Sequence, residues 1–275
     1  MTDPRRRRPA IALAAALALA VVLTLVLRPW APVRGEGRWA GPEGAWTQVF
    51  ADEFDGDVLD RSVWQPDRGG ATPALPFNWD IEGAWFDPSN VTVADGRLIL
   101  TVEREARAVR DGDYDYSTGM VQTLPDVPVR PPVYVEARVR VPSCDGCWPA
   151  FWLHPLDRWP PEIDIAEFLE VGSEPRPSFN YIDPVENRSG PDMYGNPDVD
   201  YRDGFHTYGL LWDGERAVPH LDGVAYEALA ATEDMTDLPM MIILNLSVRD
   251  GYAPAPGAHM DVEWVRAWEP TPDGL

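Results

Sequence analysis

The sequence predicts an all-β fold, a sandwich or barrel built from many antiparallel strands. Three observations predict it. Apolar and polar residues alternate with the two-residue period of strands in almost every segment after residue 46, and no long segment between residues 47 and 269 keeps a helical period. Twenty-nine prolines and 22 glycines interrupt these segments at short intervals. With 275 residues, 45% of them hydrophobic, the chain can bury a substantial core without crosslinks.

The first 28 residues form a segment of their own. The cluster Arg5–Arg8 precedes an uncharged run, Ala10–Leu27, which has the composition of an export signal or a membrane anchor. No clear small-x-small cleavage site follows this run, which favours an uncleaved anchor, and the arginines stay on the cytoplasmic side in either case. We therefore expect the rest of the chain outside the cell, either secreted or tethered to the membrane through residues 10–27.

The remaining chain is expected to form one domain with short flanking segments. The expected parts are a signal or anchor at 1–28, a Pro/Gly-rich linker at 29–46, a β domain at 47–270 and a tail at 271–275. The clearest predicted strands lie within residues 90–103, with a turn at Asp95-Gly96, and at 133–141, 205–212, 241–248 and 260–268.

The charge of the chain bears on its partners. The formal net charge is −22, and removal of residues 1–28 would make the rest more acidic still. Such a surface repels phosphate backbones and anionic lipid headgroups, which argues against nucleic acid or a membrane surface as the partner of the folded part. A neutral ligand fits better, although acidity also serves solubility alone. We expect a monomer.

Only two cysteines occur, Cys144 and Cys147 in the segment "SCDGCWPAF". Two thiols cannot make a four-cysteine zinc site, and a thioredoxin-like site would need a βαβ context that the sequence does not show. A disulfide closing a small loop is the favoured interpretation in an exported protein.

The segment "RWPPEIDIAEFLEV" carries three closely spaced acids, Glu162, Asp164 and Glu167. Proline followed by acids is an ordinary helix start, so local rules favour a helix here. In an all-β context the segment is instead a strand, and Glu162 and Asp164 share one face. A one-residue bulge at Ile165-Ala166 would bring Glu167 back to that face, and bulges often lie beside active sites.

Three carboxylates on one sheet face cannot all ionise cheaply, so at least one should keep a proton. One ionised and one protonated carboxyl are what two-carboxylate glycoside hydrolysis needs. Trp148 and Trp152 are four residues apart, so both can line the same face of one strand. A single such tryptophan is more often core, but next to carboxylates the pair also fits a stacking platform for sugar rings.

"EIDIAE" resembles the catalytic signature ExDxxE of glycoside hydrolase family 16, in the bulged form of its laminarinase-like branch. The resemblance extends over about residues 47 to 269, through "VFADEFDGDVLDRSVW", "NVTVADGRLIL", "YVEARVRVPSCDGCWPAFWLHP", "FHTYGLLWDGERAVPHLDG", "PMMIILNLSV" and "HMDVEWVRAWE" in the family's order. It implies a β-jelly-roll with an open cleft and a retaining, endo-acting hydrolase of β-linked polysaccharide. Glu162 would be the nucleophile, Asp164 its partner and Glu167 the acid/base.

The resemblance also implies binding residues and a metal. The expected sugar-binding residues are Trp148, Trp152, Asn90, Asn245, His206 and Asn180, although a hydrogen-bonded structural histidine is the favoured role for His206. No cofactor is expected for catalysis, while a structural calcium ion would be held by Glu53, the Gly96 carbonyl and Glu263.

The sequence departs from the laminarinase-like pattern around the expected cleft. Asp87 stands where these members usually have an arginine, Asn180 stands where a histidine is frequent, and the segment "RDGYAPAPGAHM", which begins at Arg249, replaces the usual glycine-tryptophan loop. A β-1,3- or β-1,3-1,4-glucan is the expected substrate. Two alternatives remain: a glycan-binding protein without catalysis on the same fold, and a transglycosylase acting on cell-envelope glycan.

Overall fold

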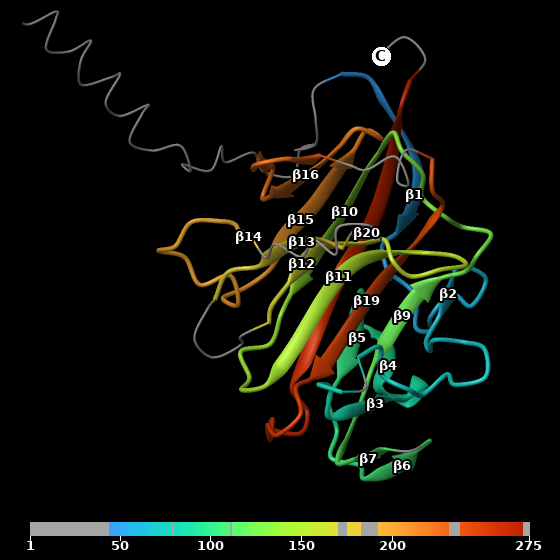
Figure 1. Cartoon of the computed structure of the whole chain (residues 1–275), viewed down its shortest axis with the longest axis vertical. Helices are drawn as coiled ribbons and strands as arrows, with labels where there is room; N and C mark the ends of the chain where they lie inside the picture. The colour runs from blue at the N-terminus through green and yellow to red at the C-terminus, as the bar shows by residue number, and fades with distance from the viewer. Residues whose placement is uncertain are drawn as a thin grey trace, which may run out of the picture. The chain divides into compact units, whose positions relative to one another are not determined.

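The computed structural model describes residues 44–78, 80–110, 112–169, 175–182, 192–230 and 237–271 (Figure 1). Within these ranges the only helical element is the 3-10 turn Pro88–Asn90, and two large antiparallel sheets hold most of the strands. The all-β prediction is confirmed. The helix-start alternative for the acidic segment is wrong, because Glu162–Glu167 is a strand in the middle of a sheet.

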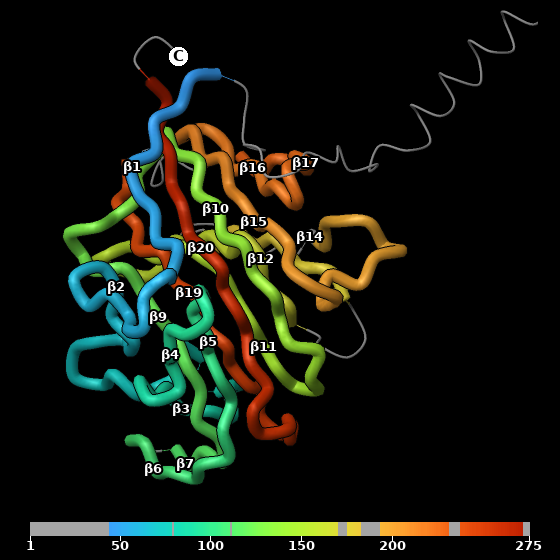
Figure 2. Tube along the Cα trace, turned by 180° about the vertical axis from the view of Figure 1, so that it is seen from behind, coloured from blue at the N-terminus to red at the C-terminus, as the bar shows by residue number. Residues whose placement is uncertain are grey.

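The first sheet contains β1 Trp46–Asp52, β4 Val91–Ala94, β5 Arg97–Thr101, β10 Val133–Arg140, β15 His206–Trp212, β16 Arg216–Leu221, β17 Val224–Ala225, β18 Leu229–Ala230 and β20 His259–Pro270. Its path runs β17-β16-β15-β10-β20-β5-β4, with β1 beside β20 and β18 beside β16. Figure 2 shows β15, β10, β20 and β1 side by side in this layer.

The second sheet contains β2 Trp64–Gln65, β9 Met120–Thr123, β11 Cys147–Pro155, β12 Glu162–Glu167, β13 Ser178–Ile182, β14 Asp192–Met193 and β19 Met240–Val248. Its order is β14-β13-β12-β11-β19-β9-β2. The remaining strands form two small pairs, β3 Ala84–Phe86 with β8 Tyr116–Thr118 and β6 Arg107–Val109 with β7 Gly112–Tyr114.

The predicted hairpin within residues 90–103 is confirmed. β4 and β5 pair antiparallel, and Asp95 and Gly96 connect them with φ angles of 52° and 69°. Two consecutive positive φ angles are the requirement of the tight hairpin turn that matches strand twist, and Asp-Gly is among the dipeptides that adopt it most readily.

The core lies between the two sheets and follows the alternation along each strand. In β10 the buried residues Val133, Val135, Ala137 and Val139 face the core. In β19 one set of alternate residues, Met240 to Val248, also belongs to this core, while the other set faces outward on the second sheet. Two residues of the outward set, Asn245 and Ser247, matter for function, because they line a cleft.

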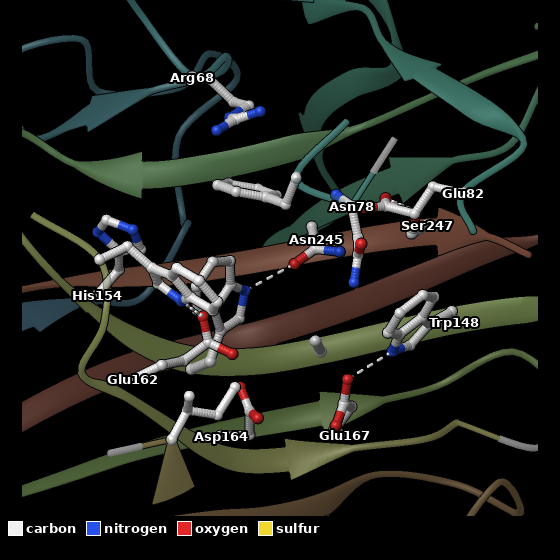
Figure 3. Close-up of a pocket in the computed structure, with 15 residues that line it drawn as sticks. Arg68, Asn78, Glu82, Trp148, His154, Glu162, Asp164, Glu167, Asn245 and Ser247 are labelled. Carbon is white, nitrogen blue, oxygen red and sulfur yellow. Dashed lines mark hydrogen bonds between the residues drawn. The ribbon is translucent and has the colours of Figure 1, made fainter. Parts of the chain in front are cut away.

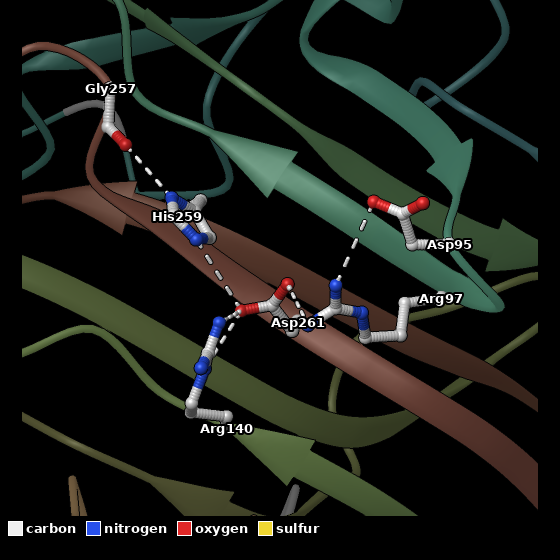
Figure 4. A network of polar contacts seen from close by, with 6 residues as sticks. All are labelled: Asp95, Arg97, Arg140, Gly257, His259 and Asp261. Carbon is white, nitrogen blue, oxygen red and sulfur yellow. Dashed lines mark hydrogen bonds and ion pairs between the residues drawn. The ribbon is translucent and has the colours of Figure 1, made fainter. Parts of the chain in front are cut away.

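A network of charges crosses the face of the first sheet that is turned away from this core. Asp261 in β20 is 1% exposed and accepts two hydrogen bonds from Arg140 in β10, at 2.6 and 3.0 Å (Figure 4). Arg97 in β5 lies 3.6 Å away and His259 lies 3.5 Å away. These contacts join three neighbouring strands, and a buried carboxylate with two arginine partners holds them together better than an exposed pair would.

The predicted disulfide between Cys144 and Cys147 is confirmed, and it closes the loop that leads into β11. The predicted signal or anchor, most of the linker and most of the tail lie outside the described residues. No helix within the described ranges has the length and apolar character needed to cross a bilayer.

Candidate active site

The cleft lies on the outer face of the second sheet, and its floor is formed by β19, β11 and β12. Strand pairing places residues of these strands in rows across the sheet: Ser247 with Trp148, then Asn245 with Ala150 and Glu167. Ala150 is small and stands between Trp148 and Trp152 on its own strand, so it leaves a hollow between the two indole rings.

The predicted bulge in β12 is confirmed. Trp152 pairs with Asp164 while Phe151 pairs with Ala166, so Ile165 is the extra residue. Ile165 and Ala166 both point into the core, where they are fully or almost fully buried. Because two successive side chains turn inward, Glu167 returns to the face that carries the other two acids, and all three carboxylates line the cleft (Figure 3).

Indole N–H groups hold both outer carboxylates. The Trp148 Nε1 donates to Glu167 Oε1 at 2.7 Å, and the Trp159 Nε1 donates to Glu162 Oε2 at 2.8 Å. Asn180, on β13 behind the triplet, donates its Nδ2 to Glu167 Oε2 at 2.5 Å. The two carboxylates are thereby fixed in orientation at opposite ends of the row of acids (Figure 3).

Burial perturbs the protonation of all three acids. It raises the pKa of Glu162 and that of Glu167 to about 7 each, and it raises the pKa of Asp164 well above its usual range. The charges of Glu162 and Glu167 raise the pKa of Asp164 further, and the Asp164 carboxyl shares a hydrogen bond with Glu162 that lowers the pKa of Glu162. The direction of these shifts favours the protonated form of Asp164, whose O–H group donates to Glu162.

Aromatic and amide groups form the walls. Trp152 donates its Nε1 to Asn245 Oδ1 at 2.7 Å and packs edge-on against Phe77, with ring centroids 4.7 Å apart. Trp159 is 58% exposed, so its ring remains open to a ligand. The remaining lining residues were not predicted as site residues: Arg68, Phe77, Asn78, Glu82, Ala150, His154, Trp159, Ile182 and Ser247.

A family model described as "Glycosyl hydrolases family 16" matches residues 85–266, about two thirds of the chain. The chain belongs to glycosyl hydrolase family 16. This match includes the strand that carries the three acids and all the strands of the cleft floor.

Two endo-1,3-1,4-beta-glycanases of Rhizobium meliloti, EglC and ExsH, are 30% and 31% identical to the chain over 244 and 247 residues. The aligned part is 81% of this chain but 51% of each relative, so the chain spans about half the length of these family members. Among solved structures, the catalytic domain of an endo-1,3-beta-glucanase (laminarinase) from Thermotoga petrophila superposes with a TM-score of 0.71. It is 26% identical, and the match covers 83% of this chain and 100% of that one.

The structure places two of the sugar-binding residues expected from family 16 outside the cleft. Asn90 is buried and donates its Nδ2 to Ser117 Oγ at 2.8 Å. His206 lies on β15 in the first sheet, where its Nδ1 is 2.8 Å from Asp222 Oδ2. Both side chains are held by protein partners away from the lining residues, and for His206 this agrees with the favoured structural role.

Asn180 lies just behind the cleft lining and contacts one of the three acids. It is 5% exposed and does not line the cleft, but it contacts Glu167 directly. Trp148, Trp152 and Asn245, the other residues expected to bind sugar, all line the cleft.

The residues expected to bind the calcium found in family 16 members do not fit a calcium site. The Glu53 carboxylate is engaged by Arg266 through two hydrogen bonds of 2.7 and 2.8 Å, and Glu263 accepts from Arg138 at 2.5 Å. Two guanidinium groups in these positions neutralise the carboxylates and repel a divalent cation. The described ranges also contain no cluster of three or more histidine, cysteine or acidic side chains placed to hold a metal.

The raised pKa of Glu167 predicts how stability depends on pH. Since burial moves this pKa from 4.5 to about 7, the stabilising contribution of the protonated carboxyl is complete below pH 4.5 and is lost as pH rises through 7. Glu167→Gln removes this ionisation, so we expect the variant to gain on the order of 1–3 kcal/mol in free energy of unfolding at pH 8, which raises its Tm above that of the parent by a few degrees. Near pH 4.5 the two Tm values should match.

Thermal unfolding followed by circular dichroism between pH 4.5 and 8 measures this difference. The control is Glu215→Gln, which changes an exposed carboxylate in the turn between β15 and β16 and should give a Tm difference that does not vary with pH. A Tm difference for Glu167→Gln that stays constant over this range would contradict the expected protonation of the cleft.

Proposed function

We propose that the chain is a retaining, endo-acting glycoside hydrolase that cleaves β-1,3- or β-1,3-1,4-glucan. The observation that carries the proposal is the bulged strand β12, which brings Glu162, Asp164 and Glu167 together on the floor of an open cleft. The chain shares its family and its fold with proteins named endo-β-glucanases, which supports this reaction class.

We assign Glu162 as the nucleophile and Glu167 as the acid/base, and their hydrogen bonds support this assignment. Glu162 accepts hydrogen bonds from Trp159 and from the protonated Asp164, and both favour its ionised form, as a nucleophile requires. Glu167 has a pKa of about 7, so it can give a proton to the leaving oxygen and take one back from water. The Trp148 and Asn180 donors stabilise the carboxylate that Glu167 becomes after the first step. No cofactor enters this chemistry.

The substrate is proposed from the relatives and from the cleft. Of the sequence departures from the laminarinase-like pattern, Asn180 contacts the triplet through Glu167. The other two do not touch the triplet: Asp87 caps the 3-10 turn by accepting from the Ser89 N–H at 2.8 Å, and Arg249 donates to the Leu169 carbonyl at 3.1 Å. Tyr252, in the altered loop, packs against Gly146 before β11. The departures at Asp87 and in the loop after β19 therefore act on the surroundings of the cleft, whereas Asn180 acts directly beside Glu167.

Export is also proposed, with residues 10–27 as a membrane tether. The uncharged run after the arginine cluster supports this proposal, and so does the disulfide, because disulfides form and persist in oxidising compartments outside the cytoplasm. A polysaccharide outside the cell is the corresponding substrate.

A polysaccharide panel tests the proposed function. We expect cleavage of laminarin or lichenan into short oligosaccharides, with agarose, carrageenan and xyloglucan left intact, and mass spectrometry of the products gives their sizes. The membrane and soluble fractions of the expressing cells are assayed separately, which also tests the tether. Tight binding without cleavage would indicate a glycan-binding protein instead, and products longer than the substrate would indicate transglycosylation.

A further inference from the structure

A fourth carboxylate, Glu82, lines the cleft beyond the catalytic triplet. It is 5% exposed and lies at the end of the cleft that holds Trp148 and Glu167 (Figure 3). The Asn78 backbone N–H donates to Glu82 Oε1 at 2.5 Å, and the Ser247 hydroxyl donates to Glu82 Oε2. Each carboxylate oxygen can accept a second hydrogen bond, so the group retains acceptor capacity on its cleft side.

The backbone around Glu82 is fixed to the cleft floor. Glu82 forms a β-bridge with Arg249 just after β19, and the Gly83 N–H donates to the Val248 carbonyl at 2.7 Å. A Cβ on Gly83 would lie 3.1 Å from the Asp250 Cα, so the two segments approach each other more closely than most side chains allow. The carboxylate is thus held in a preorganised position, as a binding group requires.

Burial of this carboxylate is not matched by an ion pair. Among the described residues no cation lies within salt-bridge distance of Glu82, because the Arg68 guanidinium instead donates to the carbonyls of Leu75 and Pro76. Burial raises the pKa of Glu82, with Arg68 opposing the rise only at a distance. A neutral glutamine could accept the Asn78 N–H through its oxygen and donate its NH2 group to the Ser247 hydroxyl oxygen, at a lower desolvation cost, so fixing the loop does not require an acid here.

The surroundings of Glu82 indicate what it binds. Asn78, Asn245 and Ser247 offer further polar groups next to it, and the Trp148 indole offers an apolar surface. Sugar hydroxyls are good donors to a carboxylate, and the C–H faces of a sugar ring stack on an indole. An anionic substituent, such as a carboxylate or a sulfate, would instead meet Glu82 at short range and be repelled.

We propose that Glu82 is a specificity-determining residue, whose carboxylate accepts hydrogen bonds from the hydroxyls of a neutral sugar unit at the Trp148 end of the cleft and rejects anionic units there. This inference rests on the proposed function, since it names the class of sugar that the same cleft selects. Glu82 takes no part in bond cleavage.

Isothermal titration in an inactive background tests the proposal. The parent is Glu162→Gln, and its ligands are a neutral β-1,3-glucan heptasaccharide and a carboxymethylated preparation of the same oligosaccharide. Adding Glu82→Gln should weaken binding of the neutral ligand about 10- to 100-fold, the range for losing a hydrogen bond to a charged acceptor. The preference for the neutral over the anionic ligand should fall at least as much, because the repulsion is lost as well.

The matched control is Glu136→Gln in the same background. Glu136 is also 5% exposed, and burial raises its pKa, as it does for Glu82, but Glu136 lies on β10 in the first sheet and accepts from the Tyr134 hydroxyl. This variant should leave both affinities unchanged. If Glu82→Gln only loosened the loop, it would weaken binding of both ligands to the same extent. An unchanged preference for the neutral over the anionic ligand in this variant would therefore overturn the inference.

Two further outcomes of the titration are a destabilised Glu82→Gln protein and a parent that binds neither ligand. If the Glu82→Gln protein unfolds at a lower temperature than its parent, the ligand preference is measured in Ser247→Ala instead. This variant keeps the Glu82 carboxylate but removes the hydroxyl that donates a hydrogen bond to one of its oxygens. An unaltered preference in that variant overturns the inference. If the parent binds neither ligand, the proposed function fails and this inference fails with it, whereas binding by the parent with an unchanged preference in Glu82→Gln overturns this inference alone.

Discussion

Replacing Glu162 by glutamine should lower kcat on the cleaved glucan by at least about 10⁴-fold while the protein remains folded. An amide cannot form the covalent glycosyl-enzyme, so the first displacement loses its nucleophile. The amide oxygen can still accept the Trp159 N–H, which keeps the side chain in place. Because burial raises the pKa of Glu162 to about 7, a neutral amide also removes an ionisation that opposes folding at alkaline pH.

Initial rates of reducing-end release and thermal unfolding, measured on the same samples, test this result. Glu136→Gln is again the control, since it makes the same substitution at a buried carboxylate of the other sheet and should retain full activity. Turnover by Glu162→Gln within tenfold of the parent would show that Glu162 is not the nucleophile.

The predictable part of the fold is the part that repeats. Two-residue alternation identified the strands that became β10, β15, β19 and β20, and the Asp-Gly pair identified a hairpin turn, because both signals are local. The bulge was also predictable, since three acids in "EIDIAE" share one face only if Ile165 is an extra residue. The order of the strands across each sheet could not be predicted from periodicity alone.

The site was predictable where its residues belong to strands with a recognisable pattern, as with the triplet and Trp148. Glu82 was not predicted, because its contact with Ser247 joins residues 165 positions apart and the segment before it has no periodic pattern. Asn90 lies outside the cleft although the family pattern places it among the sugar-binding residues, and His206 has the structural role favoured for it. Each matches a family position in the sequence, but each side chain is already held by a protein partner, Ser117 and Asp222 respectively.

Replacing Glu167 by alanine should reduce cleavage of the polysaccharide by about 10²- to 10⁴-fold, the usual contribution of a general acid/base. The loss should depend on the leaving group. A sugar leaving group needs the proton that Glu167 delivers, whereas a dinitrophenolate leaves without one, so a dinitrophenyl β-glucoside oligosaccharide should still form the glycosyl-enzyme rapidly. Hydrolysis of that intermediate then becomes slow, because no base activates the water, and a burst of dinitrophenol should precede a slow steady state.

Azide separates the roles of the two glutamates, because it is a nucleophile that needs no base. In Glu167→Ala it should attack the glycosyl-enzyme formed on Glu162, and two displacements give the β-glycosyl azide, with the configuration of the substrate. In Glu162→Ala it should enter the space of the missing carboxylate, and one displacement gives the α-glycosyl azide. Proton NMR of the two products identifies each anomer. The β-azide from Glu162→Ala and the α-azide from Glu167→Ala would reverse the roles assigned here, and this would mean that the hydrogen bond from protonated Asp164 does not mark the nucleophile.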